Sequence, residues 1–116
     1  PAEEAAAKPA PTAEPAPEPS LTIGQSNALR SAKQYLDYSG FSRTGLIGQL
    51  EFEGYSTEDA TFAVDAVGAD WNAEAAESAQ QYLDYTSFSR QGLIDQLIFE
   101  GFTPAEAEFG VAAVGY

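Results

Sequence analysis

A block of 41 residues occurs twice in this chain, with a constant offset of 47 positions. Residues 28–68 align with residues 75–115 without a gap, and 25 of the 41 positions are identical. An internal repeat of this length predicts one small structural unit that is used twice. A unit of about 45 residues buries little core and is marginally stable alone. We therefore expect the two copies either to pack on each other or to depend on strong local helix signals.

The composition divides the chain into three segments. Residues 1–20 consist mainly of Pro, Ala and Glu and contain six of the seven Pro residues, so they cannot bury enough apolar surface to offset chain entropy. We predict that they form a disordered stalk or an extended polyproline-like spacer; a polyproline ligand for another domain is the alternative. Residues 21–68 then form the first helical repeat, and residues 69–116 form the second.

Capping residues and apolar spacing predict three helices in the first repeat, over about residues 23–37, 43–53 and 57–68. In each, apolar residues recur three or four positions apart, which is typical of a helix that buries one face. Thr22 and Gln25 have the spacing of a capping box. A hydroxyl residue precedes each helix and is suited to cap it: Thr22, Ser42 and Ser56.

The second and third helices are joined by a tight turn that contains Gly54, which is typical of helix-turn-helix geometry. In the second repeat, Thr103 and Glu106 form a capping box with Pro104 at the first helical position. No segment shows the alternation expected of a β-strand. The sequence therefore predicts an all-α fold of two tandem three-helix, helix-turn-helix-like repeats after a disordered Pro/Ala/Glu-rich N-terminal stalk.

The residue types that usually carry chemistry are missing. The chain contains no Cys and no His, so it lacks a thiol nucleophile, the commonest general base and the usual transition-metal ligands. Six short helices leave little room for a cleft in which two carboxyl pKa values could be separated, and no Asp-rich calcium loop is present. We expect no catalytic residues, no metal site and no cofactor.

The charge balance points to a protein partner. The formal net charge is −13, and from residue 21 onward there are 14 acidic and 4 basic residues. The third helix of each repeat, which would read DNA, contains no Lys or Arg, so we expect no nucleic acid to bind. A basic segment of another protein fits this field better. The candidate partner-binding acidic surface comprises Glu51, Glu53, Glu58, Asp59, Asp65, Asp95, Glu100, Glu106 and Glu108.

Aromatic residues are the candidates for the contact between the repeats. Trp71 stands at the junction, where the first copy has Gly24, and we expect it to pack at the seam; a binding hot spot is the alternative. Several Phe residues fall off the main apolar stripes and could close the contact or face a partner. The candidate inter-repeat residues are Trp71, Phe52, Phe62, Phe99 and Phe109. Arg43 and Arg90 are expected to pair with a nearby carboxylate or with helix C-terminal carbonyls.

One long motif occurs in both copies. It reads Tyr-Leu-Asp-Tyr-x-x-Phe-Ser-Arg-x-Gly-Leu-Ile-x-Gln-Leu-x-Phe-Glu-Gly-[Tyr/Phe], followed by Ala-x-Phe-x-Val-x-x-Val-Gly. With Gly-Ala-Asp-Trp-Asn at the junction, this pattern closely resembles the Ltp family, also called host cell surface-exposed lipoproteins. The resemblance covers about residues 22–116. Residues 1–20 are similar to the low-complexity stalk that follows the lipid-anchor Cys in this family.

The resemblance implies a fold and a role. The family folds as tandem helix-turn-helix units on the extracellular face of the cell membrane, held by a lipid anchor whose Cys would lie upstream of this sequence. Its best-understood members come from temperate phages and act in superinfection exclusion, blocking DNA injection by a later phage through contact with its tape measure protein. No catalytic residues and no membrane contact beyond the anchor are implied. The alternative is a host envelope structural or interaction lipoprotein with no phage role.

Overall fold

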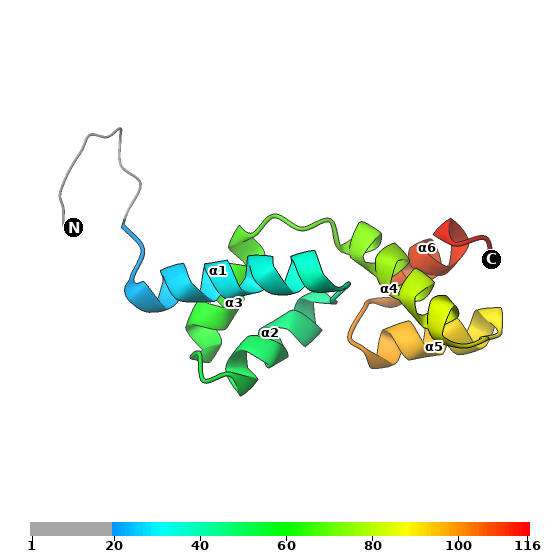
Figure 1. The fold of residues 1–116 in the computed structure, drawn as a ribbon, viewed down its shortest axis with the longest axis horizontal. Coiled ribbons are helices and arrows are strands. Elements are labelled where there is room, and N and C mark those ends of the chain that lie inside the picture. Colours follow the sequence, from blue (N-terminus) through cyan, green and yellow to red (C-terminus); the bar gives the residue numbers. More distant parts are fainter. Residues whose placement is uncertain (1–19) are drawn as a thin grey trace.

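The computed structural model describes residues 20–116; the predicted stalk falls almost entirely outside the described residues. Figure 1 shows two groups of three helices that lie end to end, with the C-terminus in the second group. The six α-helices are α1 (Ile23–Tyr38), α2 (Arg43–Phe52), α3 (Thr57–Ala66), α4 (Trp71–Tyr85), α5 (Arg90–Phe99) and α6 (Pro104–Ala113). Residues 20–116 contain no strand, so the predicted all-α class is confirmed. No helix in this part of the chain is long and apolar enough to cross a bilayer.

The helices begin where the capping residues predict. Thr22 forms a reciprocal capping box with Gln25, and Thr103 forms one with Glu106, with Pro104 in the first turn. Each box satisfies two backbone N–H groups that the helix itself leaves unpaired. At the junction Asp70 caps α4, since its carboxylate accepts hydrogen bonds from two backbone N–H groups at 3.0 and 3.1 Å.

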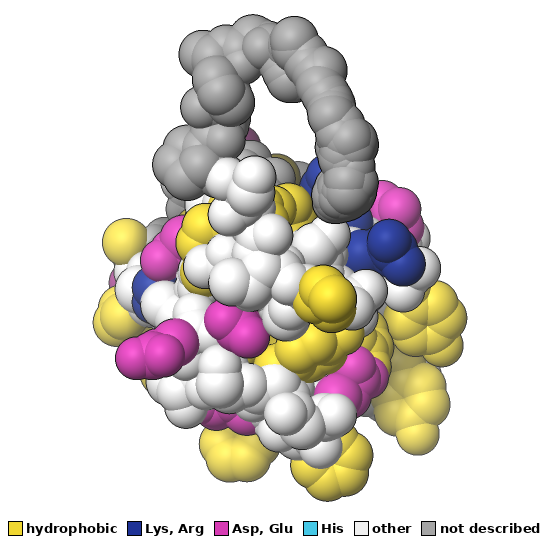
Figure 2. Space-filling model, turned by 90° about the vertical axis from the view of Figure 1, so that its left-hand side faces the viewer, with side chains coloured by type: hydrophobic (Ala, Val, Ile, Leu, Met, Phe, Trp, Pro, Cys, Tyr) yellow, Lys and Arg dark blue, Asp and Glu magenta, His cyan; other side chains and the backbone are white. Residues whose placement is uncertain are grey.

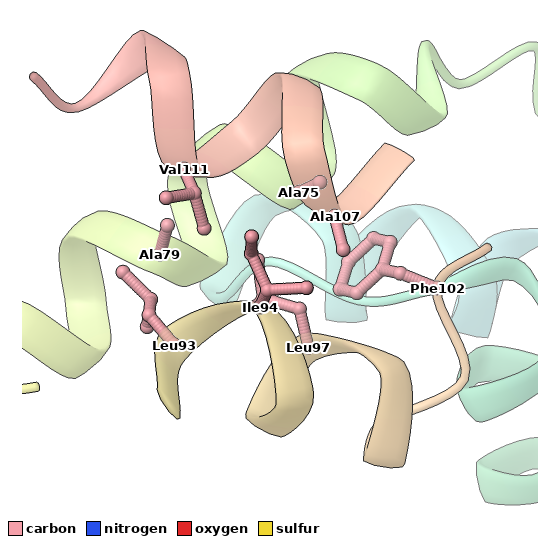
Figure 3. Packing of buried hydrophobic residues seen from close by; sticks show 8 residues of the cluster. All are labelled: Ala75, Ala79, Leu93, Ile94, Leu97, Phe102, Ala107 and Val111. Atoms are coloured by element: carbon pink, nitrogen blue, oxygen red, sulfur yellow. The ribbon is translucent and has the colours of Figure 1, made fainter. Parts of the chain in front are cut away.

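Each repeat has its own hydrophobic core. In the second repeat, apolar side chains from all three helices and from the turn before α6 point toward one another (Figure 3). The first repeat forms an equivalent cluster, in which Leu46 and Leu50 of α2 are fully buried. The third helix packs closely on the first in the second repeat, because Gly110 leaves no side chain between α6 and the carbonyl of Ala75. The two cores form separate clusters.

The hydrogen bonds between the repeats are made by a corner of the chain. We define the first corner as residues 39–44, between α1 and α2, which points toward the second repeat in Figure 1. Its hydroxyl groups reach the turn between α5 and α6: Ser42 donates to the carbonyl of Glu100 at 2.6 Å, and Thr44 donates to the carbonyl of Gly101 at 3.1 Å. Two backbone N–H groups of the corner donate hydrogen bonds to side chains of α4.

Three hydrogen bonds and one close approach join the first corner to α4. Gln81 accepts from the Ser39 hydroxyl at 3.0 Å and from the Gly40 N–H at 3.4 Å, and Glu74 accepts from the Phe41 N–H at 3.1 Å. Gly40 lies so near α4 that a Cβ there would come within 2.9 Å of the Glu74 carbonyl oxygen and of the Ser78 N. Only Gly therefore fits this position without moving backbone.

The predicted aromatic contact between the repeats is wrong for two residues. Phe52 and Phe99 are 85% and 84% exposed, because the last turns of α2 and α5 point them away from both cores. Phe109 is 51% exposed, and Phe62 is half-buried on α3; neither belongs to the side chains that pack on a core cluster. Trp71 starts α4 in the second repeat and packs, half-buried, against the core of the first.

Two neighbouring side chains on α2 should respond very differently to truncation. Leu50→Ala removes a fully buried side chain and should lower the free energy of unfolding by about 2–5 kcal/mol. Phe52→Ala removes one that is 85% exposed and should change it by less than about 0.5 kcal/mol. Urea denaturation of both variants measures the difference. A loss for Phe52→Ala as large as that for Leu50→Ala would contradict the described exposure of Phe52.

The negative charge of Glu74 is unfavourable where this side chain is partly buried against the first corner. Burial raises the pKa of the Glu74 carboxyl above its ordinary value, the hydrogen bond from the Phe41 N–H opposes this, and the nearby charges of Glu77 and Asp70 raise it further. Because the pKa of Glu74 is higher in the folded state than in the unfolded state, the protonated carboxyl contributes to stability. This contribution is complete below the unfolded-state pKa and is lost as pH rises through the folded-state pKa. Ionised Glu74 thus weakens the fold at neutral pH.

Glu74→Gln should therefore raise the melting temperature at pH 7, because Gln keeps an acceptor for Phe41 and removes the charge. The gain should fade as pH drops and wild-type Glu74 becomes protonated. Glu74→Ala is the matched control; it leaves the Phe41 N–H unpaired and should cost about 1 kcal/mol. Thermal melts of the three chains across acidic and neutral pH measure both effects. A lower melting temperature for Glu74→Gln at pH 7 would contradict the assignment.

Candidate functional site

The nine acidic residues singled out from the sequence do not form one cluster. They are distributed over α2, α3, α5, α6 and the turns that follow α2 and α5. Within residues 20–116 no group of three potential ligands is arranged to hold a metal ion. The nine carboxylates thus spread negative charge over both repeats and do not form a single site with a fixed geometry.

Several of these carboxylates already have intramolecular partners. Glu106 completes its capping box, and Glu51 accepts a hydrogen bond from the Thr57 hydroxyl. Asp95 accepts from the Gln91 amide at 2.9 Å, and Asp59 lies in the first turn of α3, where the helix dipole favours a negative charge. Glu58 and Glu108 are exposed and lie on the solvent side of α3 and α6.

One ion pair is formed within the described part of the chain. Arg43 Nε lies 2.7 Å from Asp65 Oδ1, and Arg43 Nη2 lies 3.0 Å from Asp65 Oδ2, so the contact is bidentate. The hydrogen bond to Arg43 holds the pKa of the Asp65 carboxyl below its usual range. The expected partner for Arg43 is thus present. For Arg90 the equivalent pair cannot form, since Ala112 occupies the position that corresponds to Asp65.

The same groove occurs in both repeats. In the second, a cavity of about 280 Å³ is lined by the first-corner residues Ser39 and Gly40 together with Ser78, Gln81, Tyr82, Tyr85 and Glu100. In the first, a cavity of about 210 Å³ is lined by Ser31, Gln34, Tyr35, Tyr38 and Glu53. Every residue of the second list corresponds, 47 positions earlier, to a residue of the first. We call these the second groove and the first groove; within residues 20–116, a corner is seated beside the second groove and not beside the first.

A glutamine from the second helix of the repeat holds one lining tyrosine of each groove by a hydrogen bond. Gln49 donates to the Tyr35 hydroxyl at 3.2 Å, and Gln96 donates to the Tyr82 hydroxyl at 3.1 Å. In the second groove Tyr82 also donates to the carboxylate of Glu100. Burial, followed by this carboxylate, raises the pKa of the Tyr82 hydroxyl above its ordinary value, so it remains a hydrogen-bond donor at physiological pH.

Exposed aromatic side chains stand beside both grooves. Tyr38 and Tyr85, which line them, are 84% and 87% exposed, and Phe52 and Phe99 precede the lining Glu53 and Glu100. Figure 2 views the end of the molecule that carries the first repeat and shows hydrophobic side chains protruding at its rim, with acidic side chains between them. Aromatic side chains with a polar rim are typical of protein-binding surfaces.

The grooves were not predicted from the sequence. The available signal was the retention of Ser31 and Gln34 as Ser78 and Gln81 in the second copy, although these polar residues contribute no apolar area to a core. The arrangement provides hydrogen-bond acceptors, exposed aromatic rings and negative charge.

The comparisons with known proteins show the family of this chain and agree with its fold of two repeats. A family model described as "Host cell surface-exposed lipoprotein" matches residues 24–67 and again residues 70–114, one match for each repeat. A solved structure, that of Ltp, a superinfection exclusion protein from the Streptococcus thermophilus temperate phage TP-J34, is 37% identical and superposes with a TM-score of 0.75. The match covers 80% of this chain and 97% of that one. The search of curated proteins returned no relative. The chain belongs to the host cell surface-exposed lipoprotein family, Ltp.

Proposed function

We propose that this chain acts in phage superinfection exclusion, as a non-enzymatic module that binds a protein of an incoming phage at the cell surface and stops entry of its DNA. The observation that carries the proposal is the 37% identity to a superinfection exclusion protein over both repeats. Because the match covers nearly the whole of that chain, the similarity extends to the arrangement of the two repeats and is not limited to one helix-turn-helix unit.

The proposed partner is a basic segment of the phage tape measure protein. Fourteen acidic and four basic residues follow residue 20, and a field of this sign attracts a basic polypeptide and repels nucleic acid. Negative charge distributed in this way raises the association rate with a basic partner more than it raises the affinity. The tight contact must then come from surfaces with defined shape, such as the grooves and their aromatic rims.

The proposed location is the outer face of the cell membrane, with a lipid anchor upstream of residue 1. The Pro-rich composition of residues 1–20 suits a spacer between such an anchor and α1. A tether of this kind would hold the acidic repeats close to the point where phage DNA crosses the membrane.

Displaying the chain behind a lipoprotein leader on a phage-sensitive strain should leave phage adsorption unchanged and reduce DNA entry. The free-phage titre after mixing measures adsorption, and quantitative amplification of intracellular phage DNA measures entry. A matched control displays the Leu50→Ala/Leu97→Ala variant, in which both cores are disrupted. Equal DNA entry with and without the intact chain would overturn the exclusion role and favour an envelope module of the host.

Neutralising exposed carboxylates should slow association with a basic partner. The variant Glu58→Gln/Asp95→Asn/Glu108→Gln removes three charges from exposed positions; the Asn retains an acceptor for Gln91. We expect the association rate constant for a basic tape measure fragment to fall several-fold at low salt, and the difference to shrink at high salt.

Lys33→Gln provides the opposite control for the same measurement. Position 33 corresponds to Gln80 in the second repeat, so the substitution is one that the fold already accepts. It makes the net charge more negative and should speed association. Association rates that do not follow net charge in both directions would show that the acidic field does not guide the encounter.

A further inference from the structure

The second groove shows what kind of segment such a groove accepts. The first corner is a helix end in which a hydroxyl residue, a glycine and an aromatic residue follow one another: Ser39, Gly40 and Phe41. It presents donors, namely the Ser39 hydroxyl and two backbone N–H groups, to acceptors on α4. The corner therefore binds through its backbone and through small side chains that permit close approach.

The first groove carries similar acceptors, and no corner from residues 20–116 is seated against them. Gln34 corresponds to Gln81, and Asn27 supplies a side-chain oxygen at the position of Glu74. Gly54 corresponds to Gly101, and both have positive φ, 104° and 108°. A Cβ at Gly101 would lie 2.2 Å from the Thr44 hydroxyl of the seated corner, whereas a Cβ at Gly54 would have no atom within 4 Å. The space that Thr44 and Ser42 fill beside Gly101 is therefore open, within residues 20–116, beside Gly54.

The chain's own second corner does not fit the first groove. This second corner, residues 86–91, has Ser87 where the first has Gly40. In the seated first corner a Cβ at position 40 would lie 2.5 Å from a serine hydroxyl and 2.9 Å from two backbone atoms of α4. Backbone atoms of a helix cannot move aside, so a Ser at this position is excluded. The Ser87 side chain would thus oppose head-to-tail association of chains, which would otherwise continue without closing.

Residues 1–20 contain no Gly, so they cannot supply a glycine-containing corner of this kind. The negative charge of Glu53 beside the first groove indicates which charge the occupant should carry. Glu53 lines the groove and accepts no hydrogen bond from residues 20–116, whereas its counterpart Glu100 accepts one from Tyr82. A basic residue beside the corner would find a carboxylate at this point.

We propose that the first groove is a docking site for a glycine-containing helix corner of a partner protein, with a hydroxyl residue before the Gly and a basic residue nearby, and that Ser87 keeps other copies of this chain out of it. The inference follows from the duplication and holds independently of the phage role. In this proposal Gln34 and Asn27 accept the hydrogen bonds of the docked corner, and the turn at Gly54 leaves room for it.

The chain itself supplies the probe. Ser87→Gly converts the second corner into one that fits, and Gln34→Ala removes the main acceptor of the first groove, so the double variant offers a corner but cannot bind one. Unlabelled double variant is titrated into ¹⁵N-labelled wild-type chain to about 1 mM, the range of effective concentration that a short linker provides within one chain. Progressive, saturating shifts are expected for amide signals around Asn27, Gln34 and Gly54.

Gln34→Ala alone, which keeps Ser87, is the matched control and should cause no shifts. Ser87→Gly alone has both a fitting corner and an intact groove, so its mass by sedimentation should rise with concentration while the wild-type mass stays constant. Absence of groove shifts with the double variant, shown by its own spectrum to be folded, would overturn the docking site. Equal shifts with Gln34→Ala would overturn the role of Ser87 and identify a second copy as the occupant.

Discussion

The arrangement of the two repeats depends on hydrogen bonds made by one corner of the chain. Within this corner, the Ser42 hydroxyl makes two hydrogen bonds, one in each repeat. Its hydroxyl oxygen accepts the N–H of Gly45 at 2.9 Å and so caps α2, while its proton goes to the carbonyl of Glu100 in the other repeat. That carbonyl ends α5, where helix carbonyls lack intrahelical partners. One hydroxyl thus starts one helix and satisfies the end of another. Ser89 has the same capping role at α5 and is exposed.

What could be predicted from the sequence follows from how local each feature is. The capping boxes at Thr22 and Thr103 and the cap at Ser42 depend on residues three positions apart, so the helix starts were predicted closely. The burial of Phe52 and Phe99 depends on where the other repeat lies, and apolar character alone predicted it wrongly. A large side chain at a helix end can remain in solvent when it serves a surface, so its type does not fix its position.

The candidate site was less predictable than the fold because it also depends on residues far apart in the sequence. The acidic residues were found by type, but Asp65, Asp95 and Glu106 prove to have structural partners. A count of charges cannot separate these from exposed carboxylates such as Glu108. The grooves are built from Ser, Gln and Tyr side chains of the first helix of each repeat together with the end of the second. Such residues stand out only when the two copies are compared and the corner contact is known.

The duplication has left two units with the same cores and different surfaces. Residues 69–116 contain eight acidic residues and one basic residue, whereas residues 21–68 contain six and three. The more acidic second repeat lies farther along the chain from the N-terminus, and the open first groove lies in the unit that directly follows residue 20. In a chain tethered at its N-terminus, long-range attraction would act mainly from the outer repeat. Recognition of shape would then depend on the inner repeat, since no corner from residues 20–116 is seated in its groove.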